Sequence, residues 1–123
     1  MNKEEILSQI SDMHKFMENP FPYEETTKIK VDFERDFRLL EDESLNADFN
    51  DYCNLIVGTM SYILKGNIDK IPSRQIELLN KGFFERFSKY NFFEANLVKY
   101  PDFQSEYNNH EKLRKLILDY LSN

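Results

Sequence analysis

Residues 49–64, FNDYCNLIVGTMSYIL, decide the fold class of this chain. Wound as a helix, this segment is apolar on most of its sides, which is typical of a helix buried in a core. The Lys-Gly-Asn sequence at 65–67 is typical of a helix C-terminus, and Ser44 or Asn46 can cap the other end. We therefore expect a helix over residues 49–64 that is the most buried of the fold.

Apolar residues recur at helical spacing in most of the remaining chain. The segments with such a stripe are 2–18, 27–41, 72–90, 92–99 and 108–121. Residues 28–33 also alternate as a strand would, so that a strand stays open there. Pro101 is expected to end one helix, and the pair Asn108 and Glu111 to cap the start of the last one. Because the chain has only three glycines and four prolines, a turn-rich β-sandwich is disfavoured. We expect an all-α fold, a single compact bundle of five to six helices in one domain over residues 1–123.

The composition is that of a globular chain with a single core. Of its 123 residues 41% are hydrophobic, and the formal net charge is −6. Phosphate backbones repel a chain this acidic, so we expect no sequence-independent binding to nucleic acid. No run approaches the ~18 apolar residues of a membrane span, and acids near the N-terminus argue against a signal peptide. We expect a cytoplasmic protein whose single cysteine, Cys53, is a small buried hydrophobe.

Signals of catalysis are weak in this sequence. His14 and His110 are the only histidines, and neither stands in a nucleophile or metal motif. The chain has no HExxH, CxxC, P-loop or GxGxxG motif. His14 is expected to be partly buried at the edge of the first apolar stripe, and His110 to be exposed in a first helical turn. We expect no enzyme activity, no metal site and no cofactor.

Aromatic residues crowd the C-terminal half. Phe83, Phe87 and Tyr90 keep helical register with the aliphatic residues before them and are expected in the core. Phe84 cannot share that stripe, so it either fills a second interface inside the domain or forms an exposed patch that meets a partner. The stretch 65–89 carries six bases and three acids. This leaves open a helical regulatory or adaptor protein, homodimeric in one version, that acts through its aromatic and basic C-terminal half.

The opposite imbalance lies in residues 24–51, which hold ten acids and four bases. Arg38 can pair with Asp42 at i,i+4, but no basic residue occurs between Arg38 and Lys65, so we expect the acids of that interval to be largely uncompensated. They cluster at 41–43, 48 and 51. Such a group is either a solvated helix face or a surface that steers a cationic partner, and both interpretations stay open.

Two segments carry a resemblance to a known class of proteins. With residues 31–52, VDFERDFRLLEDESLNADFNDY, and 81–103, KGFFERFSKYNFFEANLVKYPDF, the chain resembles bacterial immunity proteins of contact-dependent growth-inhibition or bacteriocin-type toxin systems. The resemblance implies tight one-to-one binding to a cognate protein toxin, often a basic nuclease. Carboxylates could then occupy the toxin's cationic cleft as phosphate mimics, with an aromatic anchor at the centre. On this hypothesis the partner-binding residues are Glu41, Asp42, Glu43, Asp48, Asp51 and Tyr52.

Overall fold

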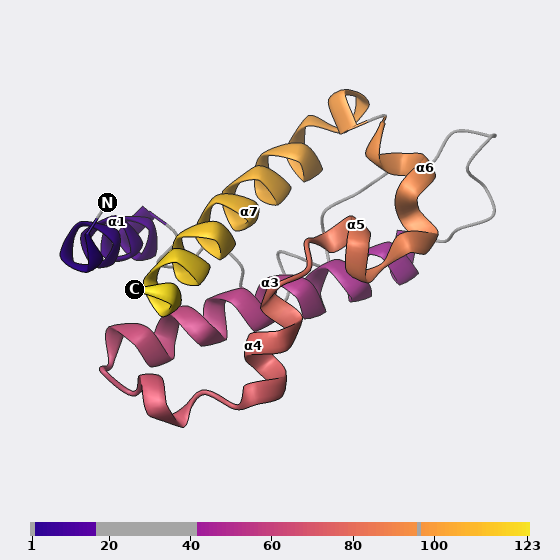
Figure 1. Cartoon of the computed structure of the whole chain (residues 1–123). Coiled ribbons are helices and arrows are strands. Elements are labelled where there is room, and N and C mark those ends of the chain that lie inside the picture. Colours follow the sequence, from indigo (N-terminus) through magenta and orange to yellow (C-terminus); the bar gives the residue numbers. More distant parts are fainter. Residues whose placement is uncertain (1, 17–41, 96) are drawn as a thin grey trace.

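The computed structural model describes residues 2–16, 42–95 and 97–123, and every regular element in these ranges is a helix (Figure 1). The three long helices are α1 (Lys3–Phe16), α3 (Asp42–Leu64) and α7 (Pro101–Ser122). Shorter α-helices are α4 (Ser73–Leu79), α5 (Phe83–Arg86) and α6 (Asn91–Glu94), and the 3-10 helices are η2 (Ile68–Lys70), η3 (Ser88–Tyr90) and η4 (Leu97–Lys99). The predicted all-α fold is confirmed. Whether the whole chain forms one domain stays a prediction.

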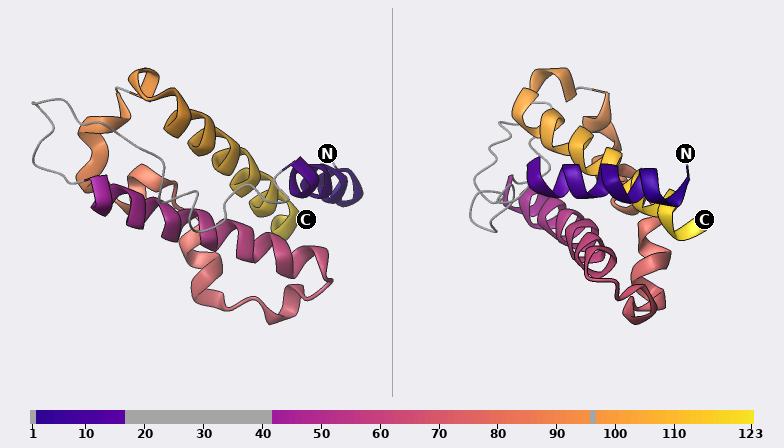
Figure 2. Two further views of the ribbon diagram at one scale, coloured as in Figure 1. Left: turned by 180° about the vertical axis from the view of Figure 1, so that it is seen from behind. Right: turned by 90° about the vertical axis from the view of Figure 1, so that its left-hand side faces the viewer.

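The two longest helices, α3 and α7, set the shape of the described part. They run in the same general direction and approach each other toward their C-terminal ends, where α1 crosses them (Figures 1 and 2). The short helices α5 and α6 lie at the wider end, beside the N-terminal half of α3 (Figure 1). The short segment from α5 to η4 therefore completes the end of the described part that the long helices leave open.

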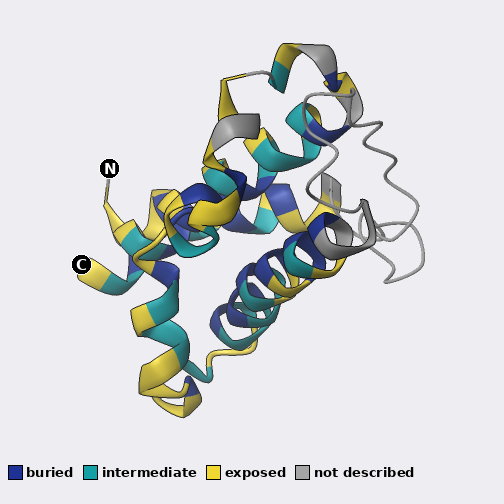
Figure 3. Ribbon diagram, turned by 90° about the vertical axis from the view of Figure 1, so that its right-hand side faces the viewer, coloured by how far each residue is buried: buried dark blue, intermediate teal, exposed yellow. Residues whose placement is uncertain are grey.

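The core is one cluster of buried side chains that joins all three long helices and the short segment (Figure 3). At its aromatic end, the ring of Phe49 on α3 lies 4.5 Å from the ring of Phe103 on α7 and 5.4 Å from the ring of Phe83 on α5. Phe83 also stacks on Tyr90, with the ring centroids 5.7 Å apart. Aromatic pairs at such spacing add about 0.5–1.5 kcal/mol each to the free energy of burial.

The helix over 49–64 is confirmed, but it is longer than predicted. It begins at Asp42, so neither Ser44 nor Asn46 is its N-cap. The periodicity was weakest over these first turns because polar residues dominate them, although Leu45 is fully buried. The predicted end is correct: Gly66 adopts a positive φ of 74°, and its N–H donates to the Ile63 carbonyl oxygen at 3.0 Å.

The predicted single helix over 72–90 is wrong. The chain leaves helical geometry after Leu79 and turns at 80–82, and a new helix, α5, begins at Phe83. The apolar stripe continued across this break because both pieces face the same core. Pro72 precedes the first residue of α4, as expected for a proline at a helix start.

The last helix begins at Pro101 and not at the predicted Asn108. Proline favours a first helical turn because its missing N–H needs no partner there and its φ is already helical. Pro101 therefore starts α7, where we expected it to end the preceding helix. The expectations for 17–41, including helix or strand at 28–33, lie outside the described residues.

Both histidine environments differ from the prediction. His14 is exposed on α1, whereas His110 is fully buried in α7. The cause at His110 is the earlier start of α7, which moves this residue from a first turn to the middle of the helix. Phe84 is buried and packs against Tyr107 at 5.3 Å, so it fills an internal interface.

Cys53 is buried on α3, as predicted. Burial, and secondarily the negative charge of Glu106, raises the pKa of its thiol. A protonated, inaccessible thiol is a poor nucleophile and metal ligand. The structural role expected from the sequence therefore stands.

Candidate partner-binding surface

Two acids of the acidic segment, Asp48 and Asp51, lie on the edge of α3 that faces α5 and η3. Asp48 and Asp51 are three residues apart on α3, so their side chains lie on neighbouring positions of one face. Opposite them stand Arg86 at the end of α5 and Lys89 in η3. This group of four residues is called the paired-charge edge below.

Asp48 is half-buried and held by two donors. The Tyr90 hydroxyl donates to its Oδ2 at 2.7 Å, and Lys89 Nζ lies 3.0 Å from the same oxygen. The Tyr90 ring is fully buried in the aromatic core, so its hydroxyl is a fixed donor. This geometry sets the orientation of the Asp48 carboxylate.

Asp51 is more accessible, with 62% of its side chain exposed. Its Oδ2 accepts a hydrogen bond from Arg86 Nη2, and the Arg86 guanidinium also lies 4.8 Å from the centre of the Phe87 ring. Only 18% of the Arg86 side chain is exposed. The planar guanidinium is thus fixed on two sides, and it fixes Asp51 in turn.

These contacts correct the expectation that the acids lack basic neighbours. Asp48 and Asp51 are both compensated: Arg86 lies 35 residues after Asp51 in the sequence, and Lys89 lies 41 residues after Asp48. Charge pairing along one helix could not reveal this, because the bases belong to other elements. Within the described ranges all three contacts end on Oδ2, which leaves Oδ1 of each carboxylate for another donor.

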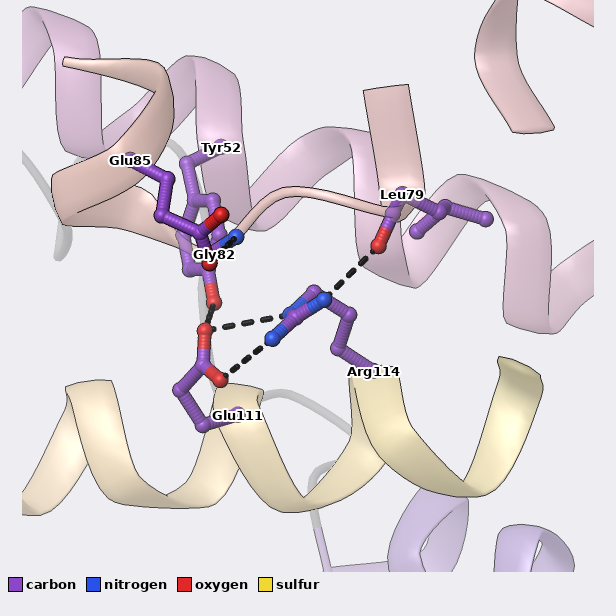
Figure 4. Close-up of polar contacts among 6 residues, drawn as sticks. All are labelled: Tyr52, Leu79, Gly82, Glu85, Glu111 and Arg114. Atoms are coloured by element: carbon purple, nitrogen blue, oxygen red, sulfur yellow. Dashed lines mark hydrogen bonds and ion pairs between the residues drawn. The ribbon is translucent and has the colours of Figure 1, made fainter. Parts of the chain in front are cut away.

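Tyr52, expected as an aromatic anchor for a partner, lies in the core with 1% of its surface exposed. Its hydroxyl donates to Glu111 Oε1 on α7 (Figure 4). Burial, followed by this bond to Glu111, raises the pKa of the Tyr52 hydroxyl, so it remains a donor. In this structure Tyr52 packs the interior and offers no surface to a partner.

Glu111 and Arg114 form a polar cluster next to Tyr52 (Figure 4). Arg114 donates from Nε to Glu111 Oε1 at 3.1 Å and from Nη2 to Oε2 at 2.8 Å. Its third donor, Nη1, reaches the carbonyl oxygen of Leu79 at 2.8 Å. Arg114 therefore ties α7 to the last turn of α4, where the chain turns toward α5.

The charge of Glu111 depends on these bonds. Burial alone would raise its pKa, but hydrogen bonds from Arg114 and Tyr52 outweigh that effect and lower the pKa below its ordinary value. Glu111 is consequently ionised at neutral pH. The cluster is a satisfied structural ion pair, and it anchors the short segment that carries Arg86 and Lys89.

The structure describes only some of the remaining predicted site residues. Asp42 and Glu43 lie in the first turn of α3, and Glu41 lies outside the described residues. Among the residues that the structure describes, no group of three or more His, Cys, Asp or Glu side chains could hold a metal ion. No helix in the described ranges is long and apolar enough to cross a membrane.

Sequence reasoning missed Tyr90, Glu111 and Arg114 as contributors to this region. Their polar contacts join elements that are far apart in the chain, and no local motif marks them. The excess of bases in 65–89 was the available signal for Arg86 and Lys89, since two of those six bases meet the acidic edge.

Comparison with known proteins shows which class of protein this chain resembles. Immunity protein WapI of Bacillus subtilis subsp. natto (strain BEST195) is 28% identical to this chain over 114 residues, which cover 93% of this chain and 86% of that protein. No solved structure matches the chain. The similarity supports an immunity function and confirms the expected resemblance to immunity proteins. A family model described as YxiJ-like protein matches residues 8–118, and the chain therefore belongs to the YxiJ-like protein family.

Proposed function

We propose that this protein is an immunity protein that binds and neutralises a cognate toxin domain, and that it acts as an inhibitor without catalysis. The observation that carries the proposal is the similarity to an immunity protein over 93% of the chain. The binding surface that we propose is the exposed side of the paired-charge edge, together with the acids at 41–43 that precede it in the sequence.

The proposed partner is cationic, for example a nuclease domain with a phosphate-binding cleft. Asp51 supports this choice because its side chain is largely exposed while one of its oxygens is fixed by Arg86. A carboxylate held in this way presents its second oxygen without first losing rotational freedom. Preorganisation of this kind lowers the entropic cost of binding.

The internal ion pairs do not prevent such binding. The Lys89 side chain is about half exposed, and a solvent-exposed ion pair contributes only about 0–1 kcal/mol. A cation of the partner can therefore replace Lys89 at Asp48, or bind beside Arg86 at Asp51, at small cost. Acids at 41–43 add to the negative field that steers the encounter.

The experiment uses the toxin domain that the proposal predicts in a gene next to this one. This protein is expressed together with that domain, and growth of the host and co-purification of the two proteins are measured. We expect the host to grow and the two proteins to co-purify one to one. If the protein neither protects the host nor binds the toxin domain, the immunity function is wrong.

The surface is tested by the double change Asp48→Asn and Asp51→Asn. Because steering acts on the encounter, we expect the association rate to fall about 10-fold at low salt and the difference to shrink at high salt. The matched control is Asp69→Asn with Glu77→Gln, two exposed acids in η2 and α4 near the other end of α3. If both double variants bind as the unchanged protein does, the toxin is bound by another surface, and the immunity function itself is unaffected.

A further inference from the structure

The turn at 80–82 lies against the ion pair of α7 (Figure 4). Arg114 Nη1 donates to the carbonyl oxygen of Leu79, the last residue of α4, at 2.8 Å. Carbonyl groups in the last turn of a helix lack partners within that helix, so a cationic donor is well placed there. Within the described ranges no backbone N–H donates to this oxygen. The bond to Arg114 therefore fixes the point where the chain leaves α4.

Gly82 brings the backbone of the same turn against both members of the ion pair. A Cβ built on this residue would lie 3.0 Å from Glu111 Oε1 and 3.4 Å from Arg114 Nη2. Both atoms are held in place, because Arg114 Nε donates to Oε1 and Nη2 donates to Oε2. The turn therefore meets the ion pair at two points, the Leu79 carbonyl and the Gly82 backbone.

One helical turn connects Gly82 to the paired-charge edge. The helix α5 has only four residues, and the backbone N–H of Arg86 donates to the carbonyl oxygen of Gly82 at 3.0 Å. The Arg86 guanidinium in turn donates from Nη2 to Asp51 Oδ2. A continuous series of contacts thus runs from Arg114 through the turn and Arg86 to the exposed carboxylate of Asp51.

The position of Arg86 depends on such contacts because a helix of four residues is not stable alone. The rings of Phe83 and Phe84 hold α5 from the side of the core, where they pack against Phe49 and Tyr107. Apolar packing is not directional, whereas hydrogen bonds to a planar guanidinium are. We therefore assign the orientation of α5, as distinct from its attachment to the core, to the polar contacts.

We propose that Arg114, held by Glu111, is a positioning residue for partner binding. Arg114 is buried and does not itself touch the partner. It fixes the turn, and through the turn it places Arg86 and the carboxylate of Asp51. This role rests on the proposed function, since it concerns the surface that we propose for the toxin domain. An ion pair inside the fold then controls how long the complex lasts.

The two rate constants of binding separate positioning from steering. The association rate at low salt depends on surface charge, which Arg114→Lys leaves unchanged. The dissociation rate depends on how well the bound groups keep their geometry. A lysine carries its charge as a point and does not reproduce the planar contact that the three nitrogens of Arg114 make. We expect an unchanged association rate and a dissociation rate that rises about 10-fold.

The experiment measures both rate constants for the full chain with the toxin domain of the growth test, at low and at high salt. Arg114→Lys, Asp51→Ala and their combination form a double-mutant cycle. If Arg114 acts through Asp51, the combined variant dissociates no faster than Asp51→Ala alone. The matched control is Ile10→Val, which weakens the core at α1, at the other end of the long helices (Figure 1), and should leave both rate constants unchanged.

Hydrogen exchange tests the positioning without the partner. In Arg114→Lys the backbone amide of Arg86 should exchange about 10-fold faster, whereas the amides of α1 should change less. Gly82→Ala disturbs the same contact from the side of the turn and should act in the same direction. The measurement therefore does not depend on the folding of one variant.

Three results would contradict the inference, and they are distinguishable. Unchanged exchange at Arg86 in a folded Arg114→Lys variant would show that Arg114 does not position this residue. Effects of Arg114→Lys and Asp51→Ala that multiply in the combined variant would show that Arg114 acts by general destabilisation. A toxin domain that the unchanged protein does not bind would contradict the proposed function, and the binding role of Arg114 would fall with it.

Discussion

The long helices and the segment 80–99 keep their shapes in different ways. The helices α1, α3 and α7 are 14, 23 and 22 residues long and bury apolar faces against one another. The segment 80–99 holds only helices of three or four residues, which are too short to be stable alone. Its conformation depends on side chains supplied by α3 and α7. The comparison shows that the apolar periodicity of the sequence determines the three long helices. Polar and aromatic contacts between residues far apart in the sequence determine the conformation of the segment 80–99.

Breaking the polar cluster should give the largest effect. Arg114→Met removes the bond to the Leu79 carbonyl and leaves Glu111 without its counter-charge in a half-buried position. We expect the free energy of unfolding to fall by about 3 kcal/mol, measured by urea denaturation at pH 7.

The control for this change is Arg74→Met on α4, where the side chain is exposed. Its expected effect is within about 0.5 kcal/mol. If Arg114→Met cost no more than Arg74→Met, the segment 80–99 would be held by its aromatic contacts alone.

Two glycines test the comparison further, because replacing each by alanine should change the free energy of unfolding in opposite directions. A Cβ on Gly82 would lie 3.0 Å from Glu111 Oε1, an atom fixed by Tyr52 and Arg114. Gly82→Ala should therefore destabilise by about 1–2 kcal/mol.

Gly58 lies inside α3, and its added Cβ would meet Gln75 Nε2 at an ordinary 3.8 Å. Gly58→Ala should stabilise by about 0.5–1 kcal/mol, because alanine is the better helix former. Thermal unfolding of both variants measures whether each substitution raises or lowers the stability. A stabilising Gly82→Ala would show that Glu111 can move aside freely.

An effect as small as that of Gly58→Ala is expected at Tyr90. Tyr90→Phe keeps the buried ring and removes only the hydroxyl that donates to Asp48 Oδ2. We expect a loss of about 0.5–1 kcal/mol in urea unfolding. The control is Tyr62→Phe, a half-buried ring of α3, which should change less. Equal losses in the two variants would mean that the Tyr90 hydroxyl adds nothing to the docking of η3.

The long helices of the fold could be predicted because the apolar patterns that indicate them are local in the sequence. The stripe through Ile6, Ile10 and Met13 gave α1, and the apolar segment ending before Gly66 gave α3. An apolar stripe does not reveal a turn between two helices that both face the same core, as at 80–82. It also does not reveal a helix start whose first turns are polar, as at Asp42 and Pro101.

The candidate site was less accessible to prediction. Clustering of acids in 41–51 pointed to one edge of α3 as a hypothesis, but the bases that pair with Asp48 and Asp51 come from α5 and η3, which follow much later in the sequence. Tyr52 was chosen for its type, and its register places it inside the core. Only the three-dimensional packing of α3 against α5 and α7 separates the exposed Asp51 from the buried Tyr52.

Cys53 gives this chain a built-in reporter. It is the single cysteine, and its thiol is buried on α3, close enough to Glu106 of α7 to feel the charge of that residue. A thiol reagent can modify it only when that part of the core opens. The modification rate therefore measures, without any added label, how often the core around Cys53 opens.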